Sequence, residues 1–112
     1  MSNALARKLE SLRLRGAMND VEVADVLGTR PETVASWDEG RAYPQAEAEK
    51  TLVELEYIVE LLADFYEPRE ARQWIFSPQK LLSGAVPAEM VRDGRIDEVL
   101  RIAGQLREGT YF

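Results

Sequence analysis

The sequence predicts an all-α protein, and three observations carry that prediction. Apolar residues recur at helical spacing in several segments, no segment alternates apolar and polar residues as a strand does, and prolines and glycines stand where helices would begin or end. With 112 residues, 46% of them hydrophobic, the chain can form one compact domain or two very small subdomains that share a core.

The first three expected helices are short. Leucines spaced at i, i+4 and i+7 predict a helix from about Asn3 to Gly16, with Gly16 as its stop. Asn19 or Asp20 is a good N-cap for a second helix, which Gly28 would end. Pro31 suits the first position of a third helix, which buries Val34 and Trp37 and closes at Gly40.

The longest periodic segment runs from Gln45 to Tyr66. Its apolar residues form a wide stripe along one side of the expected helix. A stripe of this width is typical of a helix that packs against two neighbours in the core or that also forms a homodimer seam. The sequence leaves both alternatives open. The residues expected on the stripe are Leu52, Leu55, Val59, Leu62 and Tyr66, widened by Ile58 and Phe65.

Prolines organise the remaining chain. Pro68, Pro78 and Pro87 are each expected at the first position of a helix. A final helix is expected over about residues 96 to 107. Its buried side should hold Ile96, Val99, Leu100, Ala103 and Leu106.

Composition excludes several classes of function. The chain has no cysteine and no histidine, so disulfides, thiolate nucleophiles, imidazole bases and Cys/His zinc sites are all ruled out. No base, nucleophile and orienting group stand at usable spacing, and we therefore expect neither an enzyme nor a cofactor or metal site. The chain also lacks an apolar run long enough for a membrane span, so a cytoplasmic protein is expected.

The negative charge is concentrated in one segment. The formal net charge is -6, and residues 46 to 67 account for all of it, with one lysine against seven acidic residues. A face of this kind is either a solvated surface or a surface that steers a basic partner toward the protein.

Residues 20 to 41 have the spacing of a helix-turn-helix, with a small Ala24 at the crossing and Gly28 in the turn. With Trp37-Asp38-Glu39-Gly40-Arg41 and Pro44, the segment from Leu5 to Pro44 resembles the Xre family of phage-repressor-like DNA-binding domains. The resemblance implies DNA contacts from the second and third helices. The alternative is a three-helix scaffold that no longer contacts DNA.

Three positions depart from that family. Asp20, Pro31 and Glu32 stand where the family often has a phosphate-binding glutamine and base-reading polar residues. A carboxylate repels phosphate, and proline offers no side-chain hydrogen bond. The residues that remain usable for DNA binding are Arg30, Thr33, Ser36 and Arg41.

The C-terminal half carries a second resemblance. Its elements are Trp74, Pro78, Leu81, Gly84, Pro87, Gly94, Val99 and a C-terminal glycine followed by aromatic residues. The segment looks like the toxin-binding domain of Xre/MbcA/ParS-type type II antitoxins, although Gln79 stands where the family often has asparagine and Ala85-Val86 where it has a basic and a hydroxyl residue. The resemblance implies that the chain neutralises an NAD-consuming RES-domain toxin encoded beside it. Trp74 itself is expected to pack in the core.

The same resemblance implies that the C-terminal tail blocks the NAD pocket of the toxin. Two aromatic residues after a glycine are good interface anchors on physical grounds as well. The alternative is that they fold back onto their own core. The expected toxin-binding residues are Arg107, Glu108, Gly109, Thr110, Tyr111 and Phe112.

These expectations divide the chain into a helix-turn-helix (residues 1–45), a connecting or dimerisation helix (46–66) and a toxin-binding domain (67–112). The predicted function is that of an antitoxin that binds its toxin, as a homodimer within a larger complex, with operator DNA as a further partner. A stand-alone Xre-type repressor is the alternative. That alternative predicts operator binding with a steep salt dependence and no co-purifying protein.

Overall fold

A computed structural model describes residues 4–108, with the side chains of Arg107 and Glu108 excepted. The described chain is helical throughout, as predicted, and measures 45 × 24 × 19 Å. Seven α-helices and one 3-10 turn follow one another in it: α1 (Ala4–Gly16), α2 (Asp20–Leu27), α3 (Pro31–Asp38), α4 (Ala46–Leu62), α5 (Pro68–Ile75), η1 (Lys80–Leu82), α6 (Pro87–Arg92) and α7 (Ile96–Glu108).

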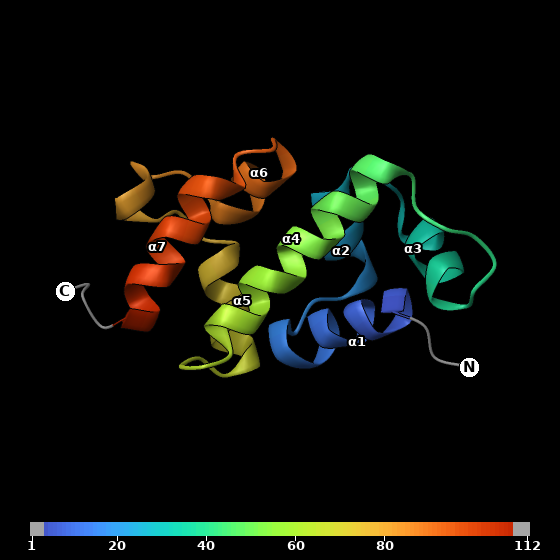
Figure 1. The fold of residues 1–112 in the computed structure, drawn as a ribbon, viewed down its shortest axis with the longest axis horizontal. Coiled ribbons are helices and arrows are strands. Elements are labelled where there is room, and N and C mark those ends of the chain that lie inside the picture. Colours follow the sequence, from blue (N-terminus) through green and yellow to red (C-terminus); the bar gives the residue numbers. More distant parts are fainter. Residues whose placement is uncertain (1–3, 109–112) are drawn as a thin grey trace.

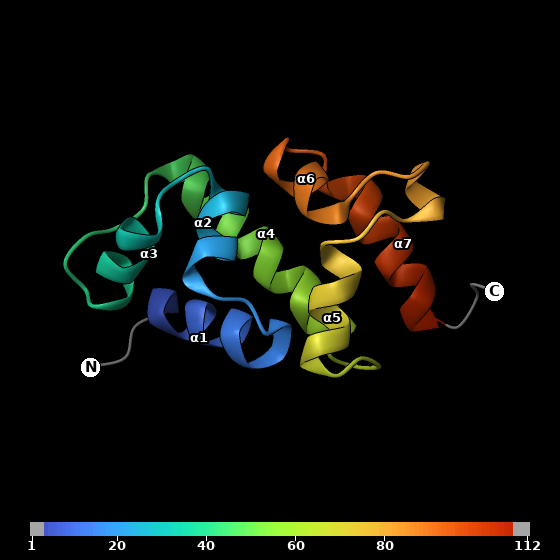
Figure 2. The same ribbon diagram turned by 180° about the vertical axis from the view of Figure 1, so that it is seen from behind.

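The long helix α4 runs through the middle of the molecule (Figure 1). Helices α1 to α3 lie at one end of the long axis, and α5 to α7 lie at the other. Helix α4 packs against α1 and α2 in the first group and against α6 and α7 in the second. Seen from behind, α2 and α5 cover α4 (Figure 2). One continuous hydrophobic core therefore joins both ends of the chain.

Local sequence signals fix most helix starts. Asn19 caps α2: its side chain accepts the backbone N–H of Glu22 at 2.9 Å, and the Glu22 carboxylate accepts the backbone N–H of Asn19 at 3.1 Å. This reciprocal capping box satisfies two N–H groups that lack helical partners. Pro31, Pro68 and Pro87 open α3, α5 and α6. The buried side of α4 holds Leu52, Leu55, Ile58, Val59, Leu61 and Leu62.

Three details of the sequence prediction were wrong around α4 and α5. The long helix ends at Leu62 and not at Tyr66, and residues 63 to 66 form a turn whose N–H groups donate to the carbonyls of Val59, Leu61 and Leu62. Phe65 consequently leaves the buried stripe and is 38% exposed. Pro78 does not open a helix: Gln79 after it is extended, and a single 3-10 turn follows.

The remaining core assignments were confirmed. Val34 and Trp37 are buried on α3, and Ala24 is buried at the crossing of α2. Trp74 is half-buried and packs against the core. On α7, Ile96, Val99 and Ala103 are buried, and Leu100 and Leu106 are half-buried. Ile102, which the sequence analysis did not place in the core, is buried as well.

Candidate functional site

The helix-turn-helix places the expected DNA-binding residues on and after α3. Arg30 is exposed, is the N-cap of α3, and has no ion pair among the described residues. Ser36 is half-buried and donates its hydroxyl hydrogen to the carbonyl of Thr33 at 2.7 Å. Arg41 is ion-paired with Glu39, and its Nε lies 2.7 Å from the Glu39 carboxylate. Of the two expected cations, Arg30 is therefore the more available to DNA.

Arg13 of α1 neutralises part of the negative charge of α2 and α3. Its guanidinium lies 3.4 Å from the carboxylate of Asp20 at the start of α2 and 3.1 Å from that of Asp38 at the end of α3. All three side chains are about one-third exposed. Because an ion pair reduces the field of each carboxylate, Asp20 repels phosphate less than its position in the sequence suggests. Glu32 is exposed and has no ion pair among the residues described.

A groove of about 490 Å³ runs between the turn of the helix-turn-helix and the segment before α4. Thr33 lines it, together with Thr29, Tyr43 and Gln45. Arg30, Ser36 and Arg41 are not among its lining residues. The structure therefore places the four expected DNA-binding residues at one end of the molecule without gathering them in a single pocket.

At the opposite end, α7 extends to Glu108. Arg107 and Glu108 are its last two residues, and Gly109, Thr110, Tyr111 and Phe112 lie outside the described residues. Ile102 and Leu106, earlier on the same helix, line a cavity of about 120 Å³. The other lining residues are Tyr66, Trp74, Gln79, Lys80 and Leu81. The helix that carries the expected tail thus ends beside a mostly apolar cavity.

Gln79 organises the loop next to this cavity. Its side-chain amide donates to the carbonyls of Trp74 at 2.9 Å and Ser77 at 3.3 Å. Its backbone N–H donates to Ala85, and its carbonyl accepts from Gly84, so that the loop closes on itself. Glutamine can therefore fill the position where the resembled family often has asparagine.

The two ends of the molecule are linked by ion pairs through α2. Glu22 pairs with Arg72 of α5, and Asp25 lies 3.7 Å from Arg92 of α6. Burial raises the pKa of the Glu22 carboxyl, but the hydrogen bonds from Arg72 and the backbone of Asn19 and the charge of Arg72 outweigh it, so the pKa is lowered. The sequence analysis placed Glu22 in the first turn of a helix. It missed Arg72, since no local signal connects residues fifty positions apart.

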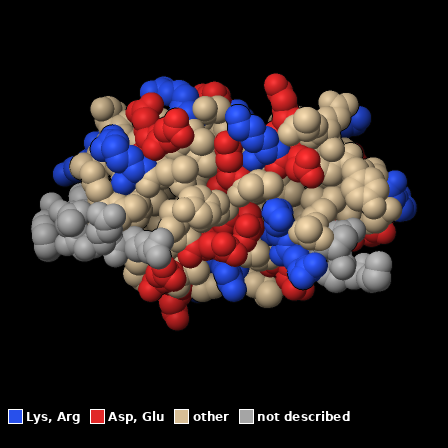
Figure 3. Space-filling view, viewed as in Figure 1, with Lys and Arg blue, Asp and Glu red and all other residues tan. Residues whose placement is uncertain are grey.

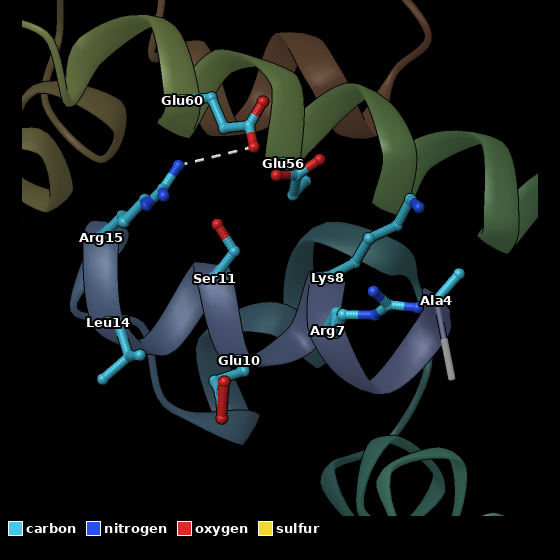
Figure 4. Close-up of a pocket in the computed structure, with 9 residues that line it drawn as sticks. All are labelled: Ala4, Arg7, Lys8, Glu10, Ser11, Leu14, Arg15, Glu56 and Glu60. Atoms are coloured by element: carbon cyan, nitrogen blue, oxygen red, sulfur yellow. Dashed lines mark ion pairs between the residues drawn. The ribbon is translucent and has the colours of Figure 1, made fainter. Parts of the chain in front are cut away.

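A second titratable cluster lies in a hollow of about 480 Å³ between α1 and α4 (Figure 4). Arg15 reaches across it to Glu60 at 3.5 Å, and Ser11 points from α1 toward α4. Burial, with the neighbouring carboxylate of Glu60, raises the pKa of Glu56 against the opposing charge of Lys8. The hollow contains acids and bases in similar number, and this mixture favours no single class of ligand.

Neither a metal site nor a membrane span is found in the described part of the chain. Among residues 4–108, no three acidic side chains come together in a way that could hold a metal ion. No helix there combines the length and apolar character needed to cross a membrane.

Comparison with known proteins places the chain in a family. No family model matches it. It is 34% identical over 109 residues to the mycobacterial cidal antitoxin MbcA of Mycobacterium tuberculosis and of Mycobacterium bovis, covering 97% of this chain and 96% of each relative. It also matches a chain of the crystal structure of the M. tuberculosis MbcT-MbcA toxin-antitoxin complex, with a TM-score of 0.87, 33% identity, and coverage of 99% of this chain and 100% of that one.

The fold is thus that of a protein from a toxin-antitoxin complex, along its full length. The chain belongs to the family of the antitoxin MbcA.

Proposed function

We propose that this chain is the antitoxin of a type II toxin-antitoxin pair and neutralises its toxin by binding it. The observation that carries the proposal is the full-length match to MbcA, in sequence and in fold. The matched structure is a complex of a toxin with its antitoxin. Because the match includes both the helix-turn-helix and the C-terminal helices, the inferred division into residues 1–45, 46–66 and 67–112 is part of the proposal.

The finer proposal concerns the mechanism. The toxin is a RES-domain enzyme that degrades NAD, and residues 107 to 112 enter its NAD site and block it. Support comes from the sequence resemblance and from α7, whose last described residues lie at the end of the molecule opposite the helix-turn-helix. An aromatic pair after a glycine suits this role, because aromatic side chains are strong anchors when a partner covers them.

Co-expression tests the proposal. The full chain should restore growth to cells that express the toxin encoded beside it, and a chain that ends at Glu108 should restore it less. The control exchanges Thr110 alone for serine, which keeps the length and both aromatic residues and should protect fully. If the shortened chain protects as well as the full chain, the tail does not block the NAD site. If the full chain gives no protection, the antitoxin function itself is wrong.

Operator binding is proposed as a secondary role within a homodimeric antitoxin. The packed helix-turn-helix supports it, since Val34 and Trp37 anchor α3 and leave Arg30 exposed beside the turn. The acidity of the chain limits non-specific affinity for DNA, which depends on the density of cations. Toxin binding is accordingly the main function in this proposal.

A further inference from the structure

Two exposed apolar residues lie together on the outward side of α4. Val53 is 43% exposed and Tyr57 is 50% exposed. They are four residues apart, which places them next to each other on one face of the helix, opposite the buried Leu55, Val59 and Leu62. We call Val53 and Tyr57 the α4 row. A tyrosine that leaves half of its surface in water keeps a large apolar area available to a partner.

Acidic side chains surround the α4 row. By helical spacing, Glu49, Glu56 and Glu60 lie on the side toward α1, and Glu54 lies on the other side. Glu60 is paired with Arg15, whereas Glu49 and Glu54 have no ion pair among the described residues. Lys50 is the one basic residue of α4. Lys8 and Arg15 of α1 face Glu56 and Glu60, so Glu49 and Glu54 are the unopposed acidic residues beside the row. In the space-filling view, uncharged surface crosses the middle of this face between acidic groups, with basic groups interspersed (Figure 3).

The side of α4 that no other helix covers is on the same broad face of the molecule as α7. In Figure 1 no helix passes in front of α4, and α7 lies beside it on the near side. In Figure 2, α2 and α5 cover α4, and the loop before α6 passes in front of α7. Helices α4 and α7 also contact each other directly. A partner that receives the residues after α7 can therefore reach the α4 row without passing around the molecule.

The charges select the class of partner. Phosphate groups of nucleic acid would be repelled by the glutamates around the row. A second copy docked through the same face would bring acidic helices against each other, which is also unfavourable. A basic protein surface with an apolar depression satisfies both the charges and the exposed side chains.

We propose that the α4 row is a second binding surface for the toxin, which presents there a basic surface with an apolar depression that receives Tyr57. This inference rests on the proposed function, because it takes the toxin as the partner. Tyr57 supplies affinity, since desolvated tyrosines at the centre of an interface are frequent hot spots. The glutamates mainly raise the association rate, because charge complementarity steers the encounter.

The test measures binding of the full chain to the purified toxin encoded beside it. Tyr57→Ser should weaken binding by about tenfold or more, as is usual for a tyrosine hot spot. Tyr43→Ser is the matched control: it removes the same atoms from a tyrosine that is 73% exposed on the loop between α3 and α4, and it should change binding by less than about twofold, as for a residue outside the interface. Circular dichroism should show equal helix content in both variants.

A charge reversal tests whether the glutamates beside the α4 row raise the association rate with the toxin. Replacing Glu49 and Glu54 together by lysine should lower the association rate at low salt and leave it nearly unchanged at high salt, because salt screens exposed charges. A Val53→Ser variant provides a second measure of the apolar contact, and a loss of affinity is expected.

The outcomes separate this inference from the proposed function. If the full chain binds the toxin but the changes at Val53 and Tyr57 leave the affinity unchanged, the α4 row is not a contact and the proposed function stands. If those changes abolish dimerisation of the free chain without affecting toxin binding, the row belongs to a second copy and the inference is wrong. If the unaltered chain does not bind the toxin, both the inference and the proposed function fail.

Discussion

The carboxylate of Glu22 serves Asn19 and Arg72 at the same time. One oxygen accepts the backbone N–H of Asn19 at 3.1 Å and closes the capping box of α2, while the other pairs with the guanidinium of Arg72 on α5. Arg72 also lies over the ring of Phe76, 5.8 Å from its centroid. The first turn of α2, which Asn19 caps locally, is therefore also linked to the C-terminal half through Arg72.

We expect a double-mutant cycle to detect this link. Glu22→Gln and Arg72→Ala should each destabilise the protein, and their coupling energy should be about 1 kcal/mol, because the Glu22 side chain is 16% exposed but that of Arg72 is 46% exposed. Urea unfolding of the two single variants and the double variant measures it. The control cycle joins Asp25→Asn with Arg92→Ala, whose side chains are 3.7 Å apart and more exposed, and its coupling should be close to zero. Equal coupling in the two cycles would contradict the special role of Glu22.

The same pair predicts a pH dependence. The pKa of Glu22 is lowered in the folded protein, so its stabilising contribution is present above the ordinary value of 4.5 and is lost as the pH falls through the lowered folded value. Arg72→Ala should flatten this part of the stability curve. Unfolding free energies of both proteins measured between neutral and acid pH give the comparison. A curve in the variant as steep as in the unaltered chain would assign the acid sensitivity to other carboxylates.

The turn between α1 and α2 offers a stabilising substitution. Ala17 has a φ of +52°, in the left-handed region that disfavours side chains with a Cβ. Ala17→Gly should raise the free energy of unfolding by about 1 kcal/mol, since relief of left-handed strain exceeds the entropy that glycine gains in the unfolded chain. Thermal or urea unfolding measures the change. A destabilised variant would show that the turn holds Ala17 without strain.

This turn also shows where sequence reasoning fails. The predicted end of α1 at Gly16 was confirmed, but Ala17, and not the glycine, takes the left-handed position that follows the helix. A Cβ on Gly16 would lie 3.1 Å from a methyl carbon of Val59, so the glycine allows α1 to approach α4 closely. That contact joins residues far apart in the chain, and a local pattern cannot reveal it.

In the candidate site, features set by neighbouring residues in the chain could be predicted from the sequence, and contacts between distant residues could not. Short-range patterns predict the cap at Asn19, the proline starts of α3, α5 and α6, and the buried Trp37. The structure has all of these features. The pairs of Arg13 with Asp20 and of Arg72 with Glu22 depend on how helices pack together. Sequence spacing alone therefore overstated the free negative charge at Asp20.

The raised pKa of Glu56 predicts a pH dependence of stability opposite to that of Glu22. Its pKa is raised by burial and by Glu60, so the folded protein holds its proton more tightly than the unfolded chain does. Stability from this group is accordingly present below the ordinary value of 4.5 and is lost as the pH rises through the raised folded value. Glu56→Gln should remove this loss and stabilise the protein at neutral pH. Glu10→Gln, an exposed change in the same hollow, is the control. A neutral-pH stability that drops in Glu56→Gln would contradict the assignment.

The proposed DNA binding by the helix-turn-helix should depend on Arg30 more than on Arg41. Arg41 must leave Glu39 to reach a phosphate, whereas Arg30 has no such competitor among the residues described. In gel shifts with the DNA upstream of the gene, Arg30→Ala should weaken binding and reduce the slope of log affinity against log salt by about 1, as for one lost phosphate contact. Arg41→Ala should weaken binding less, and the double variant should abolish the shift. Glu32→Gln should strengthen DNA binding, because removing a carboxylate from α3 lowers the repulsion of phosphate. A shift that survives in the double variant would show that α3 does not read the operator.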